Sequence, residues 1–507
     1  MSAKVLMVQG TMSSAGKTVL VAALCRIFSQ DGLRVAPFKA QNMALNSFVT
    51  ANGGEMGRAQ VVQAEAAGVE PCVDMNPVLL KPEADDRSQV IVMGKSIGSY
   101  GAGSYYKQRD QLWSIVTAAL GRLRARFELV VIEGAGSPAE VNLRDVDIVN
   151  MSIARYAQAP VLLIGDIDRG GVFAQLVGTL ELLEPEERAL LRAFVINKFR
   201  GDLSLLEPGL RFLQERTGLP VAGVIPYLKG IRLAAEDSID LEEHQRTWRP
   251  GLLDVVVIGL PHVANFDDFD PLEQEPAVAL RYVLSVEDLG SADLIIIPGT
   301  KTTVADLEHL RSTGLAQAII GEACRGTPIV GICGGYQMLG RDVLDPYGAE
   351  SVQPSVPGLG LLPVSTVFAK QKATHQVKGT VAVGRGLLAG VSGIAIEGYE
   401  IHMGSSGGEG GQPAFHLHQR SGSSCDAYDG CLSDKGLILG TYIHGLFHND
   451  RLRQAILGNL ARRKGVVLPP SAPFDRQAEY DKLAALVRHH LDMQLIYRIV
   501  EYPERFR

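Results

Sequence analysis

Short apolar runs, separated by segments of helical length, constrain the fold of this chain more than any other feature of its sequence. Each run ends in Gly, Asp, Lys or Pro, residues that commonly close a strand. The first six runs are KVLMVQG, LRVAPFK, FELVVIEG, APVLLIGD, RAFVINK and PVAGVIP. Because helical segments separate runs that are apolar throughout, the pattern predicts βα units around a parallel sheet buried on both faces.

A second series of apolar runs begins near residue 252 and contains LDVVVIGLP, ADLIIIPGT, TPIVGICGG and GLILGTYIHG. Residues 231–251, between the two series, are rich in charge and have no strong strand pattern, so we place a domain boundary near residue 250. We therefore predict an α/β protein in which residues 1–245 form one parallel-sheet domain and residues 251–448 form another.

Two further segments have their own patterns. Residues 404–412, GSSGGEGGQ, consist mainly of glycine and small polar residues, which predicts a mobile surface loop. Residues 449–507 contain two amphipathic helical patterns. We expect this helical tail to pack on the second domain.

Composition excludes several classes of partner. Hydrophobic residues make up 46% of the 507 residues and charged residues 21%, as in ordinary globular proteins. The net charge is −7 and no long basic run occurs, so we expect no nucleic acid partner. No apolar stretch reaches the roughly 18 residues of a membrane span, and the six cysteines lack C-x-x-C spacing. These features indicate a reduced, cytoplasmic protein without a membrane partner, and none of them specifies an oligomeric state.

The first strand leads into a glycine-rich loop, GTMSSAGKT, that resembles a phosphate-binding loop. Its glycines, Gly10 and Gly16, and Thr11 bring backbone N–H groups toward phosphate oxygens at the start of a helix. Lys17 supplies a positive charge and the Thr18 hydroxyl a Mg²⁺ ligand. Five residues separate Gly10 from Gly16, one more than in the usual pattern. The loop predicts binding of ATP with Mg²⁺.

Three polar residues stand at the ends of other predicted strands, where open α/β sheets bind ligands. Glu133 is a candidate for holding Mg²⁺, directly or through water. Lys39 is placed either to steady the γ-phosphate or an acyl phosphate, or to be an exposed lysine. Asn197 is placed either to read the edge of adenine or to serve as a turn asparagine.

In the second half, TPIVGICGGYQMLG predicts a strand that ends in a sharp turn carrying Cys333. A thiol at the start of a helix is favoured as thiolate and is a candidate nucleophile. Gly335 allows close backbone approach, and Gly299 in the PGTKTT loop is placed to donate a further N–H to an oxyanion. His444, at the end of the last apolar run, is the best candidate for the base. We expect the rival His402 to line the site or the interdomain face, and the rival His448 to be solvated.

A nucleophile and a phosphate loop in one chain suggest glutamine hydrolysis coupled to ATP-driven amidation. The combination of motifs resembles the cobyric acid synthase family, glutamine-dependent amidotransferases of cobalamin biosynthesis. The resemblance covers nearly the whole chain. It rests on VQGTMSSAGKT, PFKAQNMALNS, EGAGSPAEVNL, DIDRGGVFA, VINKFRGD, GICGGYQMLG, GYEIHMG and GTYIHGLF, of which the second and third are the most discriminating.

The resemblance implies an N-terminal P-loop domain similar to dethiobiotin synthetase, followed by a class I glutamine amidotransferase-like domain. It implies ATP-dependent amidation of the b, d, e and g carboxylates of adenosylcobyrinic acid a,c-diamide to adenosylcobyric acid through an acyl phosphate. Cys333 would form the thioester with glutamine, with His444 as its base. Class I glutaminases usually carry a glutamate two residues after the histidine, where this chain has Leu446. Either another acid orients His444, or the pair acts with a weaker orienting group.

Two kinds of alternative remain at this point. One is a related amidotransferase, cobyrinic acid a,c-diamide synthase or a cell-wall precursor amidase. The other is a regulatory P-loop ATPase whose second half is an inactive glutaminase fold. A corrinoid substrate is polyanionic, so basic residues in the segment 42–126 are candidates for its carboxylates; they are Arg58, Arg87, Lys95 and Arg109.

Overall fold

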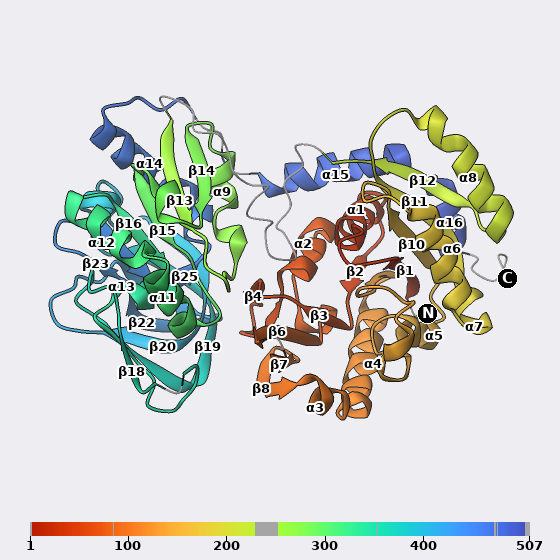
Figure 1. Cartoon of the computed structure of the whole chain (residues 1–507), viewed down its shortest axis with the longest axis horizontal. Helices are drawn as coiled ribbons and strands as arrows, with labels where there is room; N and C mark the ends of the chain where they lie inside the picture. Colours follow the sequence, from red (N-terminus) through yellow and green to blue (C-terminus); the bar gives the residue numbers. More distant parts are fainter. Residues whose placement is uncertain are drawn as a thin grey trace. The chain divides into compact units, whose positions relative to one another are not determined.

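The computed structural model describes residues 3–84, 86–228, 252–351, 353–470, 473 and 475–501. The chain divides into two compact units (Figure 1). The first contains residues 1–44, 56–236 and 475–507, and the second contains residues 45–55 and 237–474. The boundary predicted near residue 250 lies outside the described residues. In the described part of the chain, no helix has the length and apolar character needed to cross a bilayer.

A six-stranded parallel sheet forms the centre of the first unit, in the order β12-β11-β10-β1-β9-β2. The six apolar runs of the first series all form strands of this sheet, as predicted. The strands are β1 (Lys4–Gly10), β2 (Val35–Phe38), β9 (Leu129–Glu133), β10 (Val161–Asp166), β11 (Leu191–Phe199) and β12 (Val221–Pro226). The helices between them are α1 (Lys17–Gln30), α5 (Met151–Ala157), α6 (Val172–Leu182), α7 (Pro185–Arg188) and α8 (Leu203–Thr217).

The long segment after β2 folds mainly into a small sheet of its own, in the order β3-β6-β7-β8. The strands are β3 (Gln41–Met43), β6 (Val78–Ala84), β7 (Arg87–Val92) and β8 (Lys95–Gly101). The helices of this segment are α2 (Arg58–Ala67), α3 (Ala102–Tyr106) and α4 (Arg109–Arg126). Only α2 has nearly all of its residues buried, and it brings side chains to the ends of the central strands.

The second unit is built on a second six-stranded sheet, in the order β14-β13-β15-β16-β24-β23, parallel except for the pair β23 and β24. The four predicted runs supply β13 (Leu253–Ile258), β15 (Leu294–Ile297), β16 (Ile329–Ile332) and β24 (Ile438–Thr441). The pattern did not predict β14 (Val278–Val283) and β23 (Cys431–Leu432). The helices are α9 (Asp270–Gln274), α10 (Val286–Leu289), α11 (Thr303–Ser312), α12 (Leu315–Arg325) and α13 (Gly334–Leu339).

A largely antiparallel sheet completes the second unit and was not anticipated. Its strands are β17 (Asp342–Leu344), β18 (Ser355–Pro357), β19 (Ser365–Val381), β20 (Ala395–Gly407), β21 (Phe415–Arg420), β22 (Ser423–Asp429) and β25 (Ile443–His444). The loop predicted for residues 404–412 is partly wrong, because β20 continues to Gly407. Gly408 then packs so closely that a Cβ there would lie 2.2 Å from the Pro363 carbonyl oxygen.

The prediction for the tail of residues 449–507 is also partly wrong. Helix α14 (Asp450–Lys464) joins the core of the second unit. Helices α15 (Arg476–His490) and α16 (Met493–Glu501) belong to the first unit instead. Their apolar side chains share a core with α1, and Arg26 and Arg488 form ion pairs with Asp481 and Asp31 at 2.7 and 2.9 Å.

A short hairpin, Leu45–Glu55, comes from the first half of the sequence but belongs to the second unit. The hairpin contains β4 (Ser47–Val49) and the first residue of β5 (Glu55–Gly57). The sequence pattern did not predict that these residues pack with the second unit.

Candidate active site

Cys333 lies at a sharp turn between β16 and α13. Its φ of +52° is rare for a residue with a side chain, and it turns the chain directly from strand to helix. Glycine is required beneath the turn, since a Cβ on Gly335 would lie 2.1 Å from the carbonyl oxygen of Ile297. The Cys333 N–H donates to Thr441 O at 2.8 Å, which ties the turn to β24. The thiol therefore occupies a fixed position, with 7% of the residue exposed.

His444 and Asp268 complete a Cys-His-Asp arrangement. Nδ1 of His444 lies 2.7 Å from Oδ2 of Asp268, whose other oxygen accepts the Gly445 N–H at 2.6 Å. A Cβ on Gly299 would lie 2.9 Å from Cε1 of His444 and 3.7 Å from Cβ of Cys333, so the loop after β15 meets both residues. The triad logic of nucleophile, base and orienting acid is thus satisfied.

The sequence did not identify the acid that orients His444, and the structure places Asp268 in that position. It lies 176 residues before His444, in a 3-10 turn, Phe266–Asp268, and is fully buried. The sequence carries one hint of it, the acidic segment NFDDFD (265–270) soon after the first strand of the second series. Choosing among its three aspartates required the tertiary structure.

The surroundings of His444 favour its charged form. Burial by itself lowers the pKa of His444, but the Asp268 carboxylate, its hydrogen bond and the neighbouring Cys333 raise the pKa overall, to about 10. The Tyr399 ring stacks on the imidazole with centroids 5.3 Å apart. At neutral pH the residue is therefore an imidazolium beside the thiol, which suits a thiolate nucleophile.

The predicted oxyanion donors lie next to the nucleophile. Gly335 is in the first turn of α13, where backbone N–H groups have no acceptor within the helix. The carbonyl of Gly299 accepts from Ala264 N at 2.9 Å, which holds its loop in place. A Cβ on Gly334 would lie 3.1 Å from the Thr300 nitrogen, so the two predicted segments meet at the turn.

The two rival histidines have other surroundings. Nε2 of His448 lies 2.8 Å from the Asp267 carbonyl oxygen. His402 stacks on Tyr442 with ring centroids 3.8 Å apart, and its Nδ1 donates to Gly404 O at 2.5 Å. The prediction that His402 lines a site is supported, because it faces a pocket beside the nucleophile turn.

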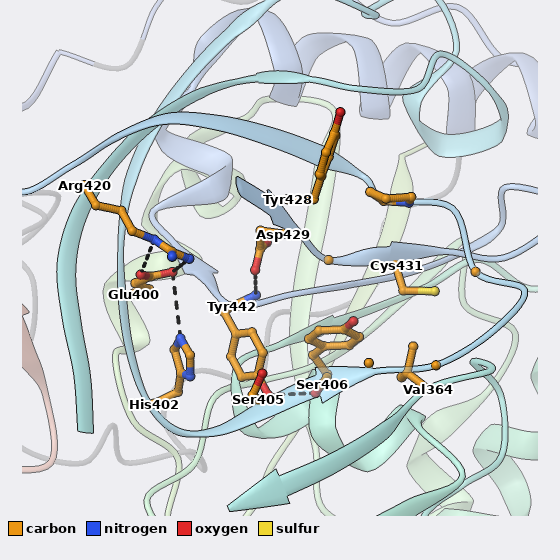
Figure 2. Close-up of a pocket in the computed structure, with 16 residues that line it drawn as sticks. Val364, Glu400, His402, Ser405, Ser406, Arg420, Tyr428, Asp429, Cys431 and Tyr442 are labelled. Atoms are coloured by element: carbon orange, nitrogen blue, oxygen red, sulfur yellow. Dashed lines mark hydrogen bonds and ion pairs between the residues drawn. The ribbon is translucent and has the colours of Figure 1, made fainter. Parts of the chain in front are cut away.

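This pocket has a volume of about 260 Å³ and is shown in Figure 2. Arg420, Glu400 and His402 lie along one side of it, and Nε of Arg420 lies 2.9 Å from a Glu400 oxygen. Asp429 also lines the pocket, and burial raises its pKa to about 6. Tyr442 connects the pocket to the nucleophile, since it also contacts Gln337 of α13 at 3.4 Å. Groups of both charges make the pocket suitable for a polar ligand.

Glu133 is the centre of the site in the first unit. One of its oxygens accepts from Thr18 Oγ1 at 2.8 Å and from Lys39 Nζ at 2.9 Å. The other accepts from Gln63 Nε2 at 2.5 Å. The structure thus brings together three residues predicted from strand and helix ends. Gln63, on α2, was missed because nothing in a helical sequence marks one glutamine among several.

The glycine-rich loop surrounds Lys17. Its Nζ donates to Met12 O at 3.0 Å and to Gly136 O at 3.1 Å, and a Cβ on Gly10 would lie 3.1 Å from Nζ. Thr11 hydrogen-bonds Gln175 through its hydroxyl at 3.0 Å. The Lys17 side chain therefore lies within the loop, with Nζ bonded to backbone carbonyls, and its binding of phosphate stays a prediction.

Asn197, predicted at the end of a strand, contacts the glycine-rich loop. Its Nδ2 donates to Ala15 O at 2.9 Å, and a Cβ on Gly16, which has a φ of +98°, would lie 2.1 Å from that nitrogen. The Asn197 side chain therefore supports the glycine-rich loop, a contact that the sequence did not show. A contact of Asn197 with the adenine edge stays a prediction.

Thr18 and Glu133 fit a Mg²⁺ ion. Their oxygens lie 2.8 Å apart at the start of α1, and Mg²⁺ prefers oxygen ligands and takes few of them from the protein. No cluster of three or more His, Cys, Asp or Glu side chains suited to a metal occurs among the residues that the structure describes. The residues match an ion shared with phosphate oxygens.

The candidate corrin-binding residues are partly corrected. Arg58 is buried at the start of α2, with 1% of the residue exposed, and pairs with Glu65 at 3.6 Å. It is therefore a structural residue. Arg87 and Lys95 are exposed on β7 and β8, and Arg109 is partly exposed at the start of α4.

Comparisons with known proteins agree with this geometry. The CobQ/CobB/MinD/ParA nucleotide binding domain matches residues 6–241, and the CobB/CobQ-like glutamine amidotransferase domain matches residues 254–452. A protein of Sorangium cellulosum named cobyric acid synthase is 54% identical over 520 aligned residues that cover 100% of both chains. A protein of Dehalococcoides mccartyi with the same name is 53% identical over 98% of this chain and 99% of its own.

Proposed function

The chain belongs to the cobyric acid synthase family, and on that basis we propose that it amidates the b, d, e and g carboxylates of adenosylcobyrinic acid a,c-diamide. Glutamine supplies the nitrogen and ATP the energy. The observation that carries this proposal is the combination, in one chain, of Cys333 with His444 and Asp268 and of a glycine-rich loop with Glu133.

In the glutaminase reaction, the Cys333 thiolate attacks the carboxamide carbon of glutamine. The N–H groups of Gly299 and Gly335 stabilise the oxyanion that forms. The His444 imidazolium gives its proton to the departing nitrogen, and ammonia leaves as the thioester forms. His444, now neutral, takes a proton from water, which attacks the thioester and releases glutamate. Asp268 holds the imidazole in the orientation that both proton transfers need.

In the ligase reaction, this chain's residues hold the phosphates of ATP. The loop from Gly10 to Gly16 surrounds the phosphates, with Lys17 and Lys39 offsetting their charge. Thr18 and Glu133 would hold a Mg²⁺ ion, which would offset the charge of the phosphates. The substrate carboxylate takes the γ-phosphoryl group of ATP with release of ADP, and ammonia then displaces phosphate from the acyl phosphate to give the amide.

Two alternatives are less well supported. An inactive glutaminase fold beside a regulatory ATPase does not require a buried acid on the histidine, yet Asp268 is fully buried against His444. A cobyrinic acid a,c-diamide synthase shares the chemistry but acts on other carboxylates. Relatives named cobyric acid synthase, with more than 50% identity over nearly the full length, favour the amidation of the b, d, e and g carboxylates.

The test of this function is a product analysis. We expect incubation with adenosylcobyrinic acid a,c-diamide, ATP, Mg²⁺ and glutamine to give four successive mass increments, each of one amide for one carboxyl group. Mass spectrometry over time measures them. Use of cobyrinic acid in place of its a,c-diamide would support the diamide synthase, and ATP turnover without any amide would support the regulatory ATPase.

A substitution at Thr18 tests the ligase site separately. We expect Thr18→Val to lower amide synthesis by on the order of 100-fold with glutamine or ammonia, because losing the hydroxyl weakens the metal site that stabilises charge in phosphoryl transfer. Glutamine hydrolysis, assayed without ATP or corrinoid, should stay within about twofold of the original rate. Thr18→Ser retains the hydroxyl and serves as the control. Equal loss in both variants would argue against a role for the hydroxyl.

A further inference from the structure

The hairpin Leu45–Glu55 lies against the glutaminase site although it comes from the first half of the sequence. It begins inside PFKAQNMALNS, a motif that the reactions described so far use only at Lys39. We propose that this hairpin is a positioning element of the glutaminase, acting on the groups that orient Cys333 and His444. The inference rests on the proposed glutaminase reaction.

The first contact is with the turn that carries Asp268. The side-chain oxygen of Asn46 accepts the Phe266 N–H at 3.3 Å, and the side-chain oxygen of Asn265 accepts the Ser47 N–H at 3.1 Å. Asn265 has a φ of +59° at the start of the 3-10 turn that ends in Asp268. Two reciprocal hydrogen bonds therefore determine where this turn begins.

These contacts are protected from water. Asn46, Ser47 and Asn265 are 3%, 0% and 3% exposed. Buried hydrogen bonds of this kind are costly to break, because the partner left behind is also desolvated. A shift of the turn would move the Asp268 carboxylate relative to His444, since Asp268 is only three residues after Asn265.

Two apolar contacts reach the other members of the triad. Phe48 packs on Tyr399 with ring centroids 5.0 Å apart, and Tyr399 in turn stacks on His444. Val49 and Ile401 belong to one buried cluster with Tyr399. The carbonyl of Ile401 accepts from Sγ of Cys333 at 3.3 Å. The hairpin thus contacts the turn that carries Asp268, the Tyr399 ring that stacks on His444, and Ile401, whose carbonyl bonds Cys333.

The hairpin is itself held firmly. Glu55 accepts from Ser47 Oγ at 2.8 Å and pairs with Lys372 Nζ at 2.6 Å. Thr374 Oγ1 donates to Gly53 O at 2.8 Å near its tip. A firmly anchored hairpin can transmit its position to the triad, whereas a loosely attached one could not.

The test is the variant Asn46→Ala in the full-length chain. We expect kcat for glutamine hydrolysis to fall by about 10- to 100-fold with KM within about threefold, because small misplacements of catalytic groups have effects of this size. Amide synthesis from added ammonia should be unchanged. The alkaline limb of the pH profile should move to lower pH, since a displaced Asp268 no longer holds the pKa of His444 as high.

Asn459→Ala is the matched control. Asn459, on α14, also joins its side-chain amide to the backbone of a distant segment, here with Nδ2 donating to Leu387 O and Ala389 O at 2.9 and 3.1 Å, and these bonds involve no member of the triad. It should show neither the kcat loss nor the pH shift at a similar thermal stability. In an Asp268→Asn background, Asn46→Ala should add less than about twofold, because both changes act through one group.

Two outcomes overturn the proposal. One is an Asn46→Ala variant whose hydrolysis and pH profile match those of Asn459→Ala. The other is a full additive loss in the Asp268→Asn background. Failure of the proposed function itself looks different, because the unmodified protein would then hydrolyse no glutamine and Cys333→Ala would change nothing.

Discussion

Cys333→Ala is expected to abolish amide synthesis from glutamine while leaving synthesis from added ammonia. Without the thiol no thioester forms, and removing the nucleophile of such an arrangement lowers the rate by roughly 10⁴-fold or more. The ligase groups lie in the other unit, with Thr18, Lys39 and Glu133 in direct contact with one another. Product formation at fixed ATP, with glutamine or ammonium chloride as nitrogen source, measures the two activities.

Cys324→Ala is the control for this experiment. Cys324 is an exposed free thiol on α12. Its loss should change neither activity, which separates the role of Cys333 from a general effect of removing a thiol. Equal loss of both activities in Cys333→Ala would contradict the assignment of separate sites.

Asp268→Asn is expected to have the second-largest effect, a loss of about 100- to 10,000-fold in kcat for glutamine hydrolysis. An asparagine has nearly the shape of the aspartate but lacks its charge, and comparable changes in catalytic triads reach the upper end of this range. Asp270→Asn, a neighbouring half-buried aspartate at the start of α9, is the matched control. It should keep most of the activity.

The pH profile gives Asp268→Asn a distinctive signature. The carboxylate holds the pKa of His444 up, to about 10, whereas burial alone lowers it. Removing the charge therefore lowers the pKa, and the imidazolium that protonates the leaving nitrogen is lost at a lower pH. We expect the alkaline limb of the kcat profile to move to lower pH. An unchanged limb with reduced activity would mean that Asp268 does not control this proton.

Most of the fold was predictable because its central strands are apolar on both faces. KVLMVQG and TPIVGICGG could be recognised from composition and length alone, and each leads into a loop that carries chemistry. The long strand β19 escaped prediction because many of its residues are half-buried or exposed, which leaves no continuous apolar run. The segment of α15 and α16 was predicted as a single amphipathic helix and was assigned to the wrong unit. An amphipathic pattern shows that a face is buried and does not show against what.

The residues of the candidate site were also predictable only in part. Cys333, His444, Lys17 and Thr18 stand at turns whose local sequence signals their role. The contact of Asn197 with Ala15 could not be predicted, because it joins segments far apart in the chain.

The sequence alone determined the two parallel sheets, the phosphate loop and the nucleophile turn, because short-range patterns of apolar residues and glycine specify strands and turns locally. Only the tertiary structure decided that Asp268 orients His444, that Gln63 and Lys39 meet on Glu133, and that residues 45–55 lie beside the triad. The physical reason is that these contacts depend on how separate segments pack in space, and a hydrogen bond between residues 176 positions apart leaves no mark on either local pattern.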